Sequence, residues 1–137
     1  MFTITTNINI TKEQVSDLIC TAIEGGSNYW YMIEGYQEPS VVDFRCSMFA
    51  NDEKPHRIYD WPLCTGGGVI ISAVESDRWA SSNPIHHTLN LESITKGLTL
   101  MGSKFPERLV NISNDDYDAE DADIFLQLSL FGDVIFG

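Results

Sequence analysis

The segment over residues 119–131 limits the fold most, because it predicts a helix that is apolar around nearly its whole circumference. Only Asp123 and Gln127 form a narrow polar sector. The apolar positions are Ile124, Phe125, Leu126, Leu128, Leu130 and Phe131. A short helix of this kind must be buried, inside one chain or between two. One sheet face cannot cover all of this apolar surface. We therefore expect a homo-oligomer, most simply a two-fold dimer, formed through this helix or through the strand expected after it.

Six carboxylates within nine residues lead into and open this helix. A calcium loop starting at Asp116 would need Gly at its sixth position and Glu at its twelfth, where the chain has Asp121 and Gln127. The positive end of the helix dipole favours acidic residues without any metal. We therefore predict no metal site and interpret the run as an acidic interaction surface. Its candidate residues are Asp115, Asp116, Asp118, Glu120 and Asp121.

The densest aromatic cluster of the chain follows a Gly-Gly pair, over residues 28–31. Three rings at a turn beside an amide and a hydroxyl are able to form a ligand-binding wall. Such clusters are more often part of the core, and the sequence leaves both interpretations open. The candidate ligand or partner residues are Asn28, Tyr29, Trp30 and Tyr31, with Arg57, Arg78 and Arg108 as available phosphate clamps.

Hydrophobic periodicity predicts the N-terminal elements. Apolar and polar residues alternate over 2–10, which indicates a half-buried strand. Thr11 and Gln14 have the form of a capping box that opens an amphipathic helix. Gly25 and Gly26 are expected to end that helix with positive φ.

The middle of the chain predicts a hairpin and a second helix. A nearly continuous apolar run over 69–74 indicates a central strand, with residues 85–89 as its hairpin partner. His86 and His87 are adjacent in that partner, so we expect them on opposite faces and not as ligands of one metal. Asn90 is placed to cap the helix that follows. Further extended segments are expected over 41–49, 58–62 and 133–137.

These elements predict one α+β domain over residues 1–137. We expect a mostly antiparallel sheet of about four to six strands, packed with about three helices. No linker or internal repeat divides the chain.

The charge balance narrows the classes of partner. Eight Lys and Arg against twenty Asp and Glu give a net charge of −12. This charge repels phosphate backbones and anionic membranes, so we expect no direct nucleic-acid or membrane binding, whereas a basic protein surface is complementary to it. Three separated cysteines without a CxxC pair, and no apolar run near the roughly 18 residues of a membrane span, suggest a reduced cytosolic protein. No cofactor is implied.

Both ends of the chain carry specific motifs. The first covers residues 19–30 and contains Glu-Gly-Gly-Ser-Asn-Tyr-Trp, and the second combines residues 121–125 with 130–137. Together they resemble the opening and closing signatures of a family of small, uncharacterised proteins carried by tailed bacteriophages. Residues 67–77 and 89–98 fit the family's hairpin-then-helix order more loosely. The resemblance implies an accessory phage protein acting in the host cytoplasm, and it carries over no catalytic or binding residue.

The leading hypothesis is a non-catalytic counter-defence inhibitor that binds a host or defence-system protein through an acidic surface. The rival hypothesis is an oligomeric sponge that sequesters a nucleotide second messenger of a host immune system, with the aromatic rings stacking on bases. A small nucleotide hydrolase is the third hypothesis. It would need a base and usually a metal, and no residue spacing here indicates either, so we do not expect an enzyme.

Overall fold

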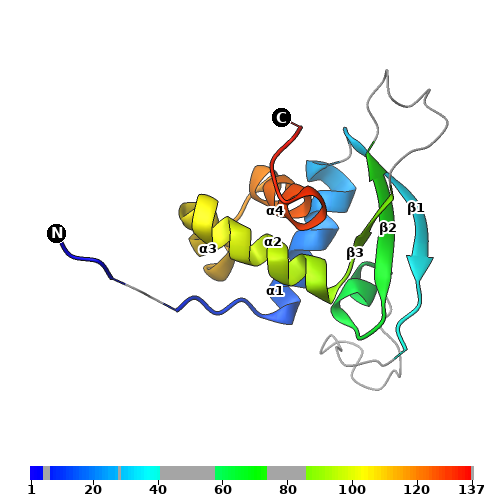
Figure 1. Ribbon diagram of the computed structural model, residues 1–137, viewed down its shortest axis with the longest axis horizontal. Coiled ribbons are helices and arrows are strands. Elements are labelled where there is room, and N and C mark those ends of the chain that lie inside the picture. Colours follow the sequence, from blue (N-terminus) through cyan, green and yellow to red (C-terminus); the bar gives the residue numbers. More distant parts are fainter. Residues whose placement is uncertain (5–6, 28, 41–57, 74–85, 137) are drawn as a thin grey trace.

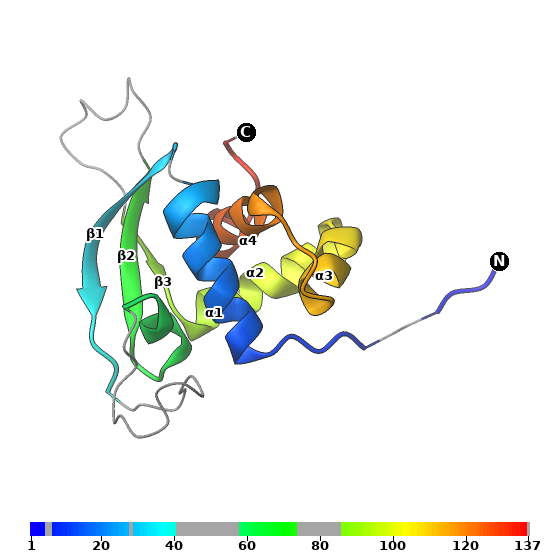
Figure 2. The same ribbon diagram turned by 180° about the vertical axis from the view of Figure 1, so that it is seen from behind.

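Four α-helices lie to one side of a three-stranded antiparallel sheet in the computed structural model, which describes residues 1–4, 7–27, 29–40, 58–73 and 86–136 (Figures 1 and 2). The elements in chain order are α1 (Lys12–Thr21), the π-helical turn η1 (Ala22–Gly26), β1 (Tyr31–Gln37), the 3-10 helix η3 (Ile58–Leu63), β2 (Gly68–Ala73), β3 (His86–Leu89), α2 (Leu91–Lys104), α3 (Pro106–Ser113) and α4 (Ala119–Phe131). The α+β architecture is confirmed, and the helices and the sheet share one hydrophobic core. The described ranges hold three strands, fewer than predicted.

Strand β2 is the centre of the sheet, with β1 and β3 on either side. Val69 is fully buried, which is why the run around it is almost continuously apolar. β3 returns antiparallel and pairs Leu89 with Val69, so the predicted central strand and its hairpin partner are confirmed. His86 is exposed, while His87 meets the ring of Phe131 edge-on, with centroids 4.8 Å apart. Burial of His87 lowers its pKa.

Helix α4 is the centre of the core, and its bounds are those that the sequence predicts. All of residues 121–130 is buried within the one chain. The helix packs against α1, α2, η1 and β3, so it is enclosed between the sheet and the other helices of its own chain. This burial removes the reason for expecting a dimer through α4, and the oligomeric state stays a prediction.

Two of the helices begin at the capping residues that the sequence predicts. Thr11 and Gln14 form the expected capping box: the Thr11 hydroxyl accepts from the Gln14 N–H (3.1 Å), and the Gln14 amide oxygen accepts from the Thr11 N–H (2.9 Å). Asn90 caps α2 in the same reciprocal way with Ser93. Gly132 ends α4 in the left-handed conformation (φ 76°), which residues with a side chain rarely adopt.

The N-terminal segment is not the strand that its alternating pattern predicts. Its described residues, 1–4 and 7–10, form no strand. Ile10 packs against the core, and the chain before it extends away from the helices and the sheet (Figure 1). Phe2 and Ile4 are 95% and 80% exposed. Alternation gives a segment two distinct faces but supplies no neighbouring strand, and without one the ladder hydrogen bonds of its backbone are not made.

The C-terminal residues 133–136 also form no strand, contrary to the prediction. The side chain of Gln127, which is fully buried in the middle of α4, holds their backbone instead. Its amide oxygen accepts from the N–H groups of Ile135 and Phe136 (2.8 Å each), and its Nε2 donates to the Phe136 carbonyl (2.9 Å). One amide side chain therefore takes the place of a sheet ladder.

Two further segments differ from the predictions. Residues 58–62, expected to be extended, lie in η3, where the buried Asp60 carboxylate accepts a hydrogen bond from the buried Ser16 hydroxyl and ties the segment to α1. Helix α3 was not predicted at all, although it begins at Pro106, the position where proline fits a helix best. The strand expected over 41–49 lies outside the described residues.

Replacing Gln127 with Met tests the tether of the C-terminal segment, because Met has a similar length but makes no strong hydrogen bond. We expect a loss of about 1–3 kcal/mol in the free energy of unfolding, measured by urea denaturation. Amide hydrogen exchange at Ile135 and Phe136 should also become faster. The matched control is Gln37→Met at an exposed position, which should change neither quantity. Unchanged exchange at the two amides would show that Gln127 does not hold this segment.

Candidate functional site

The two terminal motifs meet at one pocket. It has a volume of about 430 Å³ and lies between η1, the first turns of α4 and the C-terminal segment. Its lining residues are Gly25, Gly26, Tyr29, Ala119, Glu120, Asp123, Ile124, Val134 and Phe136. The volume falls within the range of about 300–1,000 Å³ that is typical of small-molecule sites. Apolar walls and two carboxylates therefore share one concave surface.

Gly26 allows η1 to touch the start of α4. A Cβ at this position would lie 2.5 Å from the Ala119 carbonyl oxygen, so any side chain would push the two segments apart. The positive φ expected at Gly25 and Gly26 is wrong, because neither residue has left-handed backbone geometry. The helix ends instead in a π-turn, in which the Ser27 N–H donates to the Ala22 carbonyl (2.8 Å). Gly26 therefore allows η1 and α4 to pack closely, and it does not reverse the chain direction.

Asp123 is the polar centre of the site. Its side chain lies on α4 and is 7% exposed. One carboxylate oxygen accepts hydrogen bonds from the Ser27 hydroxyl (2.7 Å) and the Trp30 indole N–H (2.7 Å), and the other accepts from the Tyr29 hydroxyl (2.5 Å). Three donors from a single stretch of chain therefore converge on one buried charge.

Trp30 lies in the core and is 1% exposed. Its ring stacks on Phe136, with centroids 5.3 Å apart and planes 5° apart, and it meets Phe131 at 5.3 Å. Because the ring is buried, stacks on Phe136 and does not line the pocket, it offers no stacking face to a ligand.

Tyr29 is the member of the aromatic cluster that lines the pocket. Its side chain is 53% exposed, but its hydroxyl is turned inward to Asp123. Burial of the hydroxyl, and next its hydrogen bond to the Asp123 carboxylate, raise the pKa of Tyr29 to about 12. Tyr31 instead begins β1, where its hydroxyl donates to the Ile23 carbonyl. Asn28 lies outside the described residues.

Arg108, one of the candidate phosphate clamps, is already engaged by carboxylates. Its guanidinium lies 2.7 Å from Asp121 and 3.3 Å from Glu120. The hydrogen bond to Asp121 raises the pKa of Arg108. Arg57 and Arg78, the other two candidates, lie outside the described residues. The structure therefore places Arg108 among acidic residues rather than beside the aromatic rings.

The acidic run divides between the surface and the core. Asp118 caps α4, and Asp121 completes that capping box with a carboxylate that is 2% exposed and paired to Arg108. Asp121 therefore does not belong to an exposed surface. The remaining four candidates are exposed, and we refer to them as the acidic face: Asp115, Asp116, Asp118 and Glu120.

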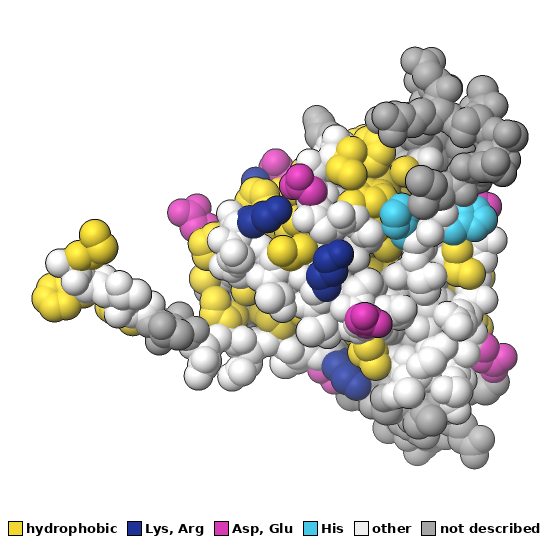
Figure 3. All heavy atoms as spheres, viewed as in Figure 1, with side chains coloured by type: hydrophobic (Ala, Val, Ile, Leu, Met, Phe, Trp, Pro, Cys, Tyr) yellow, Lys and Arg dark blue, Asp and Glu magenta, His cyan; other side chains and the backbone are white. Residues whose placement is uncertain are grey.

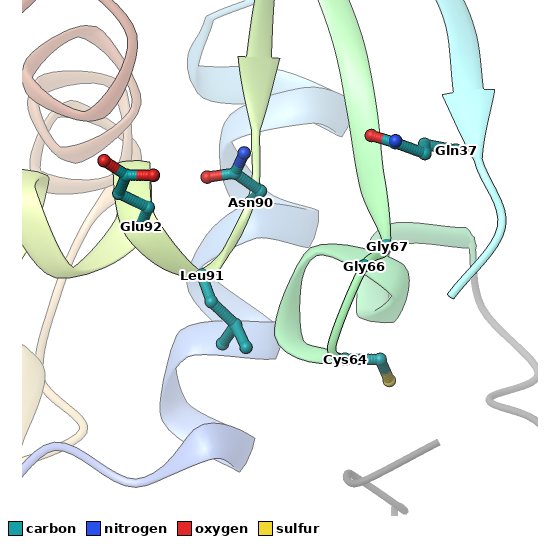
Figure 4. Close-up of a pocket in the computed structure, with 7 residues that line it drawn as sticks. All are labelled: Gln37, Cys64, Gly66, Gly67, Asn90, Leu91 and Glu92. Atoms are coloured by element: carbon teal, nitrogen blue, oxygen red, sulfur yellow. The ribbon is translucent and has the colours of Figure 1, made fainter. Parts of the chain in front are cut away.

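A second pocket, of about 270 Å³, lies where β2 and α2 begin (Figure 4). Its lining residues are Gln37, Cys64, Gly66, Gly67, Asn90, Leu91 and Glu92. The Asn90 amide oxygen accepts from the Ser93 N–H (2.9 Å), and the Cys64 thiol donates to the Asp60 carbonyl (3.7 Å). In Figure 4, the Glu92 carboxylate lies on the far side of Asn90 from Gln37. Since the polar groups of Asn90 and Cys64 are already bonded within the fold, the first pocket is the better candidate site.

Within the described ranges, no group of three or more His, Cys, Asp or Glu side chains is arranged to hold a metal ion. Cys20 and Cys64 form no disulfide, and Cys46 lies outside these ranges. None of the helices that the structure describes is both long and apolar enough to cross a membrane. No protein-family model, no curated protein and no solved structure matches the chain.

Asp123 and Ser27 are the polar residues of the site that sequence reasoning did not select. A signal for Asp123 was present, because Asp123 and Gln127 are one turn apart in a helix that is otherwise apolar. Both positions are buried, so each polar side chain needs its own partners. Ser27 carries no comparable signal, since a serine after two glycines is common in turns.

Asp123→Ala tests the polar centre. The substitution leaves the buried donors of Ser27 and Trp30 without an acceptor, and each orphaned donor costs about 1–3 kcal/mol. We expect the free energy of unfolding, measured by urea denaturation, to fall by that sum. The control, Asp116→Ala, removes an exposed carboxylate and should stay within about 0.5 kcal/mol of the natural chain. Equal effects of the two substitutions would contradict the role of Asp123.

Tyr29 should make the stability of the fold depend on pH in the alkaline range. Its folded-state pKa of about 12 lies above the ordinary value of 10.0, so the neutral hydroxyl stabilises the fold fully below pH 10.0. This contribution is lost as the pH rises toward 12. We expect Tyr29→Phe to flatten the decline of unfolding free energy in that interval and to remove one high-pH step from the phenolate absorbance. Tyr36→Phe, at an exposed position of β1, should leave that step in place. An unchanged profile for Tyr29→Phe would refute the assignment.

Proposed function

We propose that this protein is a non-catalytic phage counter-defence inhibitor that binds a host or defence-system protein through its acidic face. The observation that carries the proposal is the gathering of four exposed carboxylates around the α3–α4 turn. The cation that the structure places among them, Arg108, is already bound by Asp121 and Glu120. The turn therefore presents a surplus of negative charge to a partner.

Helix α1 braces this turn. The Gln14 side chain donates to the Ser113 carbonyl (3.1 Å) and to the Asp115 carboxylate (3.0 Å). The hydroxyls of Thr21 and Tyr117 lie 3.3 Å apart farther along the same helix. A charged surface that is already held in place loses less conformational freedom when it binds, so it is better suited to tight recognition.

The face that α2 crosses differs from the acidic face in its distribution of charge. There, Lys and Arg side chains lie apart from one another among carboxylates and uncharged surface (Figure 3). Lys96 and Lys104 belong to α2 itself. A basic partner would therefore be steered toward the α3–α4 turn rather than toward this mixed face.

The nucleotide-sponge hypothesis receives less support from the geometry. Trp30 is buried, and the pocket beside Tyr29 contains Glu120 and Asp123, whose carboxylates repel phosphate groups. Arg108 would have to leave two carboxylates before it could bind a phosphate. These contacts favour a protein partner with a basic surface.

The phage origin and the host cytoplasm as the site of action remain parts of this proposal. They rest on the resemblance of the two terminal motifs to small proteins of tailed bacteriophages. Residues of both motifs line this one pocket, which supports a shared role for the two motifs.

The test begins with the partner captured from host-cell lysate and then purified. Its affinity is compared for the natural chain and for a triple variant, Asp115→Asn, Asp116→Asn and Asp118→Asn. Asn still caps a helix, so the variant should fold. We expect about tenfold weaker binding and a flatter dependence on salt.

The matched control removes three exposed charges elsewhere, through Glu38→Gln, Glu92→Gln and Asp133→Asn. This control has the same net charge as the triple variant, so it separates the effect of location from the effect of total charge. If both variants weaken binding equally, or neither does, the acidic face is not the binding surface.

A further inference from the structure

We propose that the pocket beside the acidic face is an anchor site for one basic side chain of the partner, with arginine the best match. The proposal rests on the proposed function and names the chemistry of the partner at a specific position. The pocket places a rim carboxylate, a buried carboxylate and apolar walls around one volume.

The two carboxylates lie on one side of α4. Glu120 and Asp123 are three residues apart, which places them on adjacent turns of the same helical face. Glu120 is 68% exposed at its side chain, while Asp123 is 7% exposed overall. A cation that enters the pocket therefore meets the exposed carboxylate first and the buried one at greater depth.

Asp123 retains capacity to accept another hydrogen bond. A carboxylate offers about four acceptor positions. The described contacts use two on one oxygen, for Ser27 and Trp30, and one on the other oxygen, for Tyr29. The oxygen that faces Tyr29 therefore has room for one donor from the pocket, and an N–H of a guanidinium or ammonium group supplies it.

The ion pair of Glu120 is easily exchanged. Arg108 lies 3.3 Å from Glu120 but 2.7 Å from the buried Asp121, so its closer attachment is to Asp121. An exposed ion pair contributes little net stability. Glu120 can therefore turn to a partner's cation while Arg108 stays with Asp121.

The walls of the pocket suit an aliphatic stem. Ile124, Val134 and Phe136 line it, and Phe136 is fixed by its stack on Trp30 and by Gln127. Basic side chains bury their methylene groups along apolar surface while the charged end reaches a polar group. Arginine fits better than lysine, since its planar guanidinium group can donate hydrogen bonds to two carboxylates at once.

Gly25 lines the pocket without a side chain. A Cβ added there would meet no atom within 4 Å, and the residue does not have left-handed backbone geometry. A larger residue at this position should therefore fold and occupy the pocket. This gives a steric variant, Gly25→Phe, that leaves all charges unchanged.

The test titrates the isotope-labelled protein with N-acetyl-argininamide and follows backbone amide shifts by NMR. N-acetyl-citrullinamide is the probe's neutral counterpart of similar shape. We expect saturable shifts at Gly25, Gly26, Asp123 and Phe136 with the arginine probe and none with the citrulline probe. Glu120→Gln should weaken binding about tenfold, Gly25→Phe should abolish it, and the control Asp116→Asn should leave it unchanged.

Equal shifts with both probes would overturn the proposal, because the pocket would then not select a cation. Shifts spread over Asp115 and Asp116 would also overturn it, since they would indicate unspecific attraction to the acidic face. Failure of the proposed function is distinguishable from either result. If the triple acidic-face variant keeps its partner while the arginine probe binds as described, the cation site stands and the protein-inhibitor assignment falls.

Discussion

The hydrogen bonds to the Asp123 carboxylate are the interaction on which the rest of the site depends. Burying a carboxylate costs several kcal/mol unless donors replace the lost water. Ser27, Tyr29 and Trp30 supply those donors across sequence separations of 93 to 96 residues. They hold the chain that leaves η1 against α4, directly before β1 begins at Tyr31. One charge in the helix thereby ties the chain before β1 to α4.

Gln127 extends the same polar sector by one turn and organises the other end of the chain. It binds the backbone of residues 135 and 136, which brings the Phe136 ring onto Trp30. Asp123 and Gln127 therefore act on opposite sides of one aromatic stack: Asp123 holds the indole N–H, and Gln127 holds the segment that covers the indole face. The pocket exists because these two attachments leave space between η1 and the C-terminal segment.

Elements that are specified by neighbouring residues in the chain could be predicted from the sequence. Helix α4, the Thr11–Gln14 capping box, the Asn90 cap and the hairpin of β2 and β3 follow from periodicity and cap chemistry within a few residues. The strands predicted over 2–10 and 133–137 were wrong. A strand forms only where a neighbouring strand pairs with it, and an alternating pattern does not specify that neighbour. Of the candidate site, Tyr29 and Glu120 were selected, but Asp123 was not. Its role depends on donors more than ninety residues away, and a polar residue in an apolar helix does not reveal where its partners lie.

The carboxylates of the acidic run, which look alike in the sequence, have different roles in the structure. Asp118 and Asp121 form the capping box that begins α4, and Asp121 is also paired with Arg108. Glu120 and Asp123 face the pocket, and there the structure supplies hydroxyl and indole donors for Asp123 but only an exposed, longer ion pair for Glu120. Glu120, on the pocket side of α4, can therefore exchange its exposed partner for a cation that enters the pocket. A cationic group is the ligand that gains most there, because it satisfies the remaining acceptor position of Asp123 and pairs with Glu120 without disturbing the cap that begins the helix.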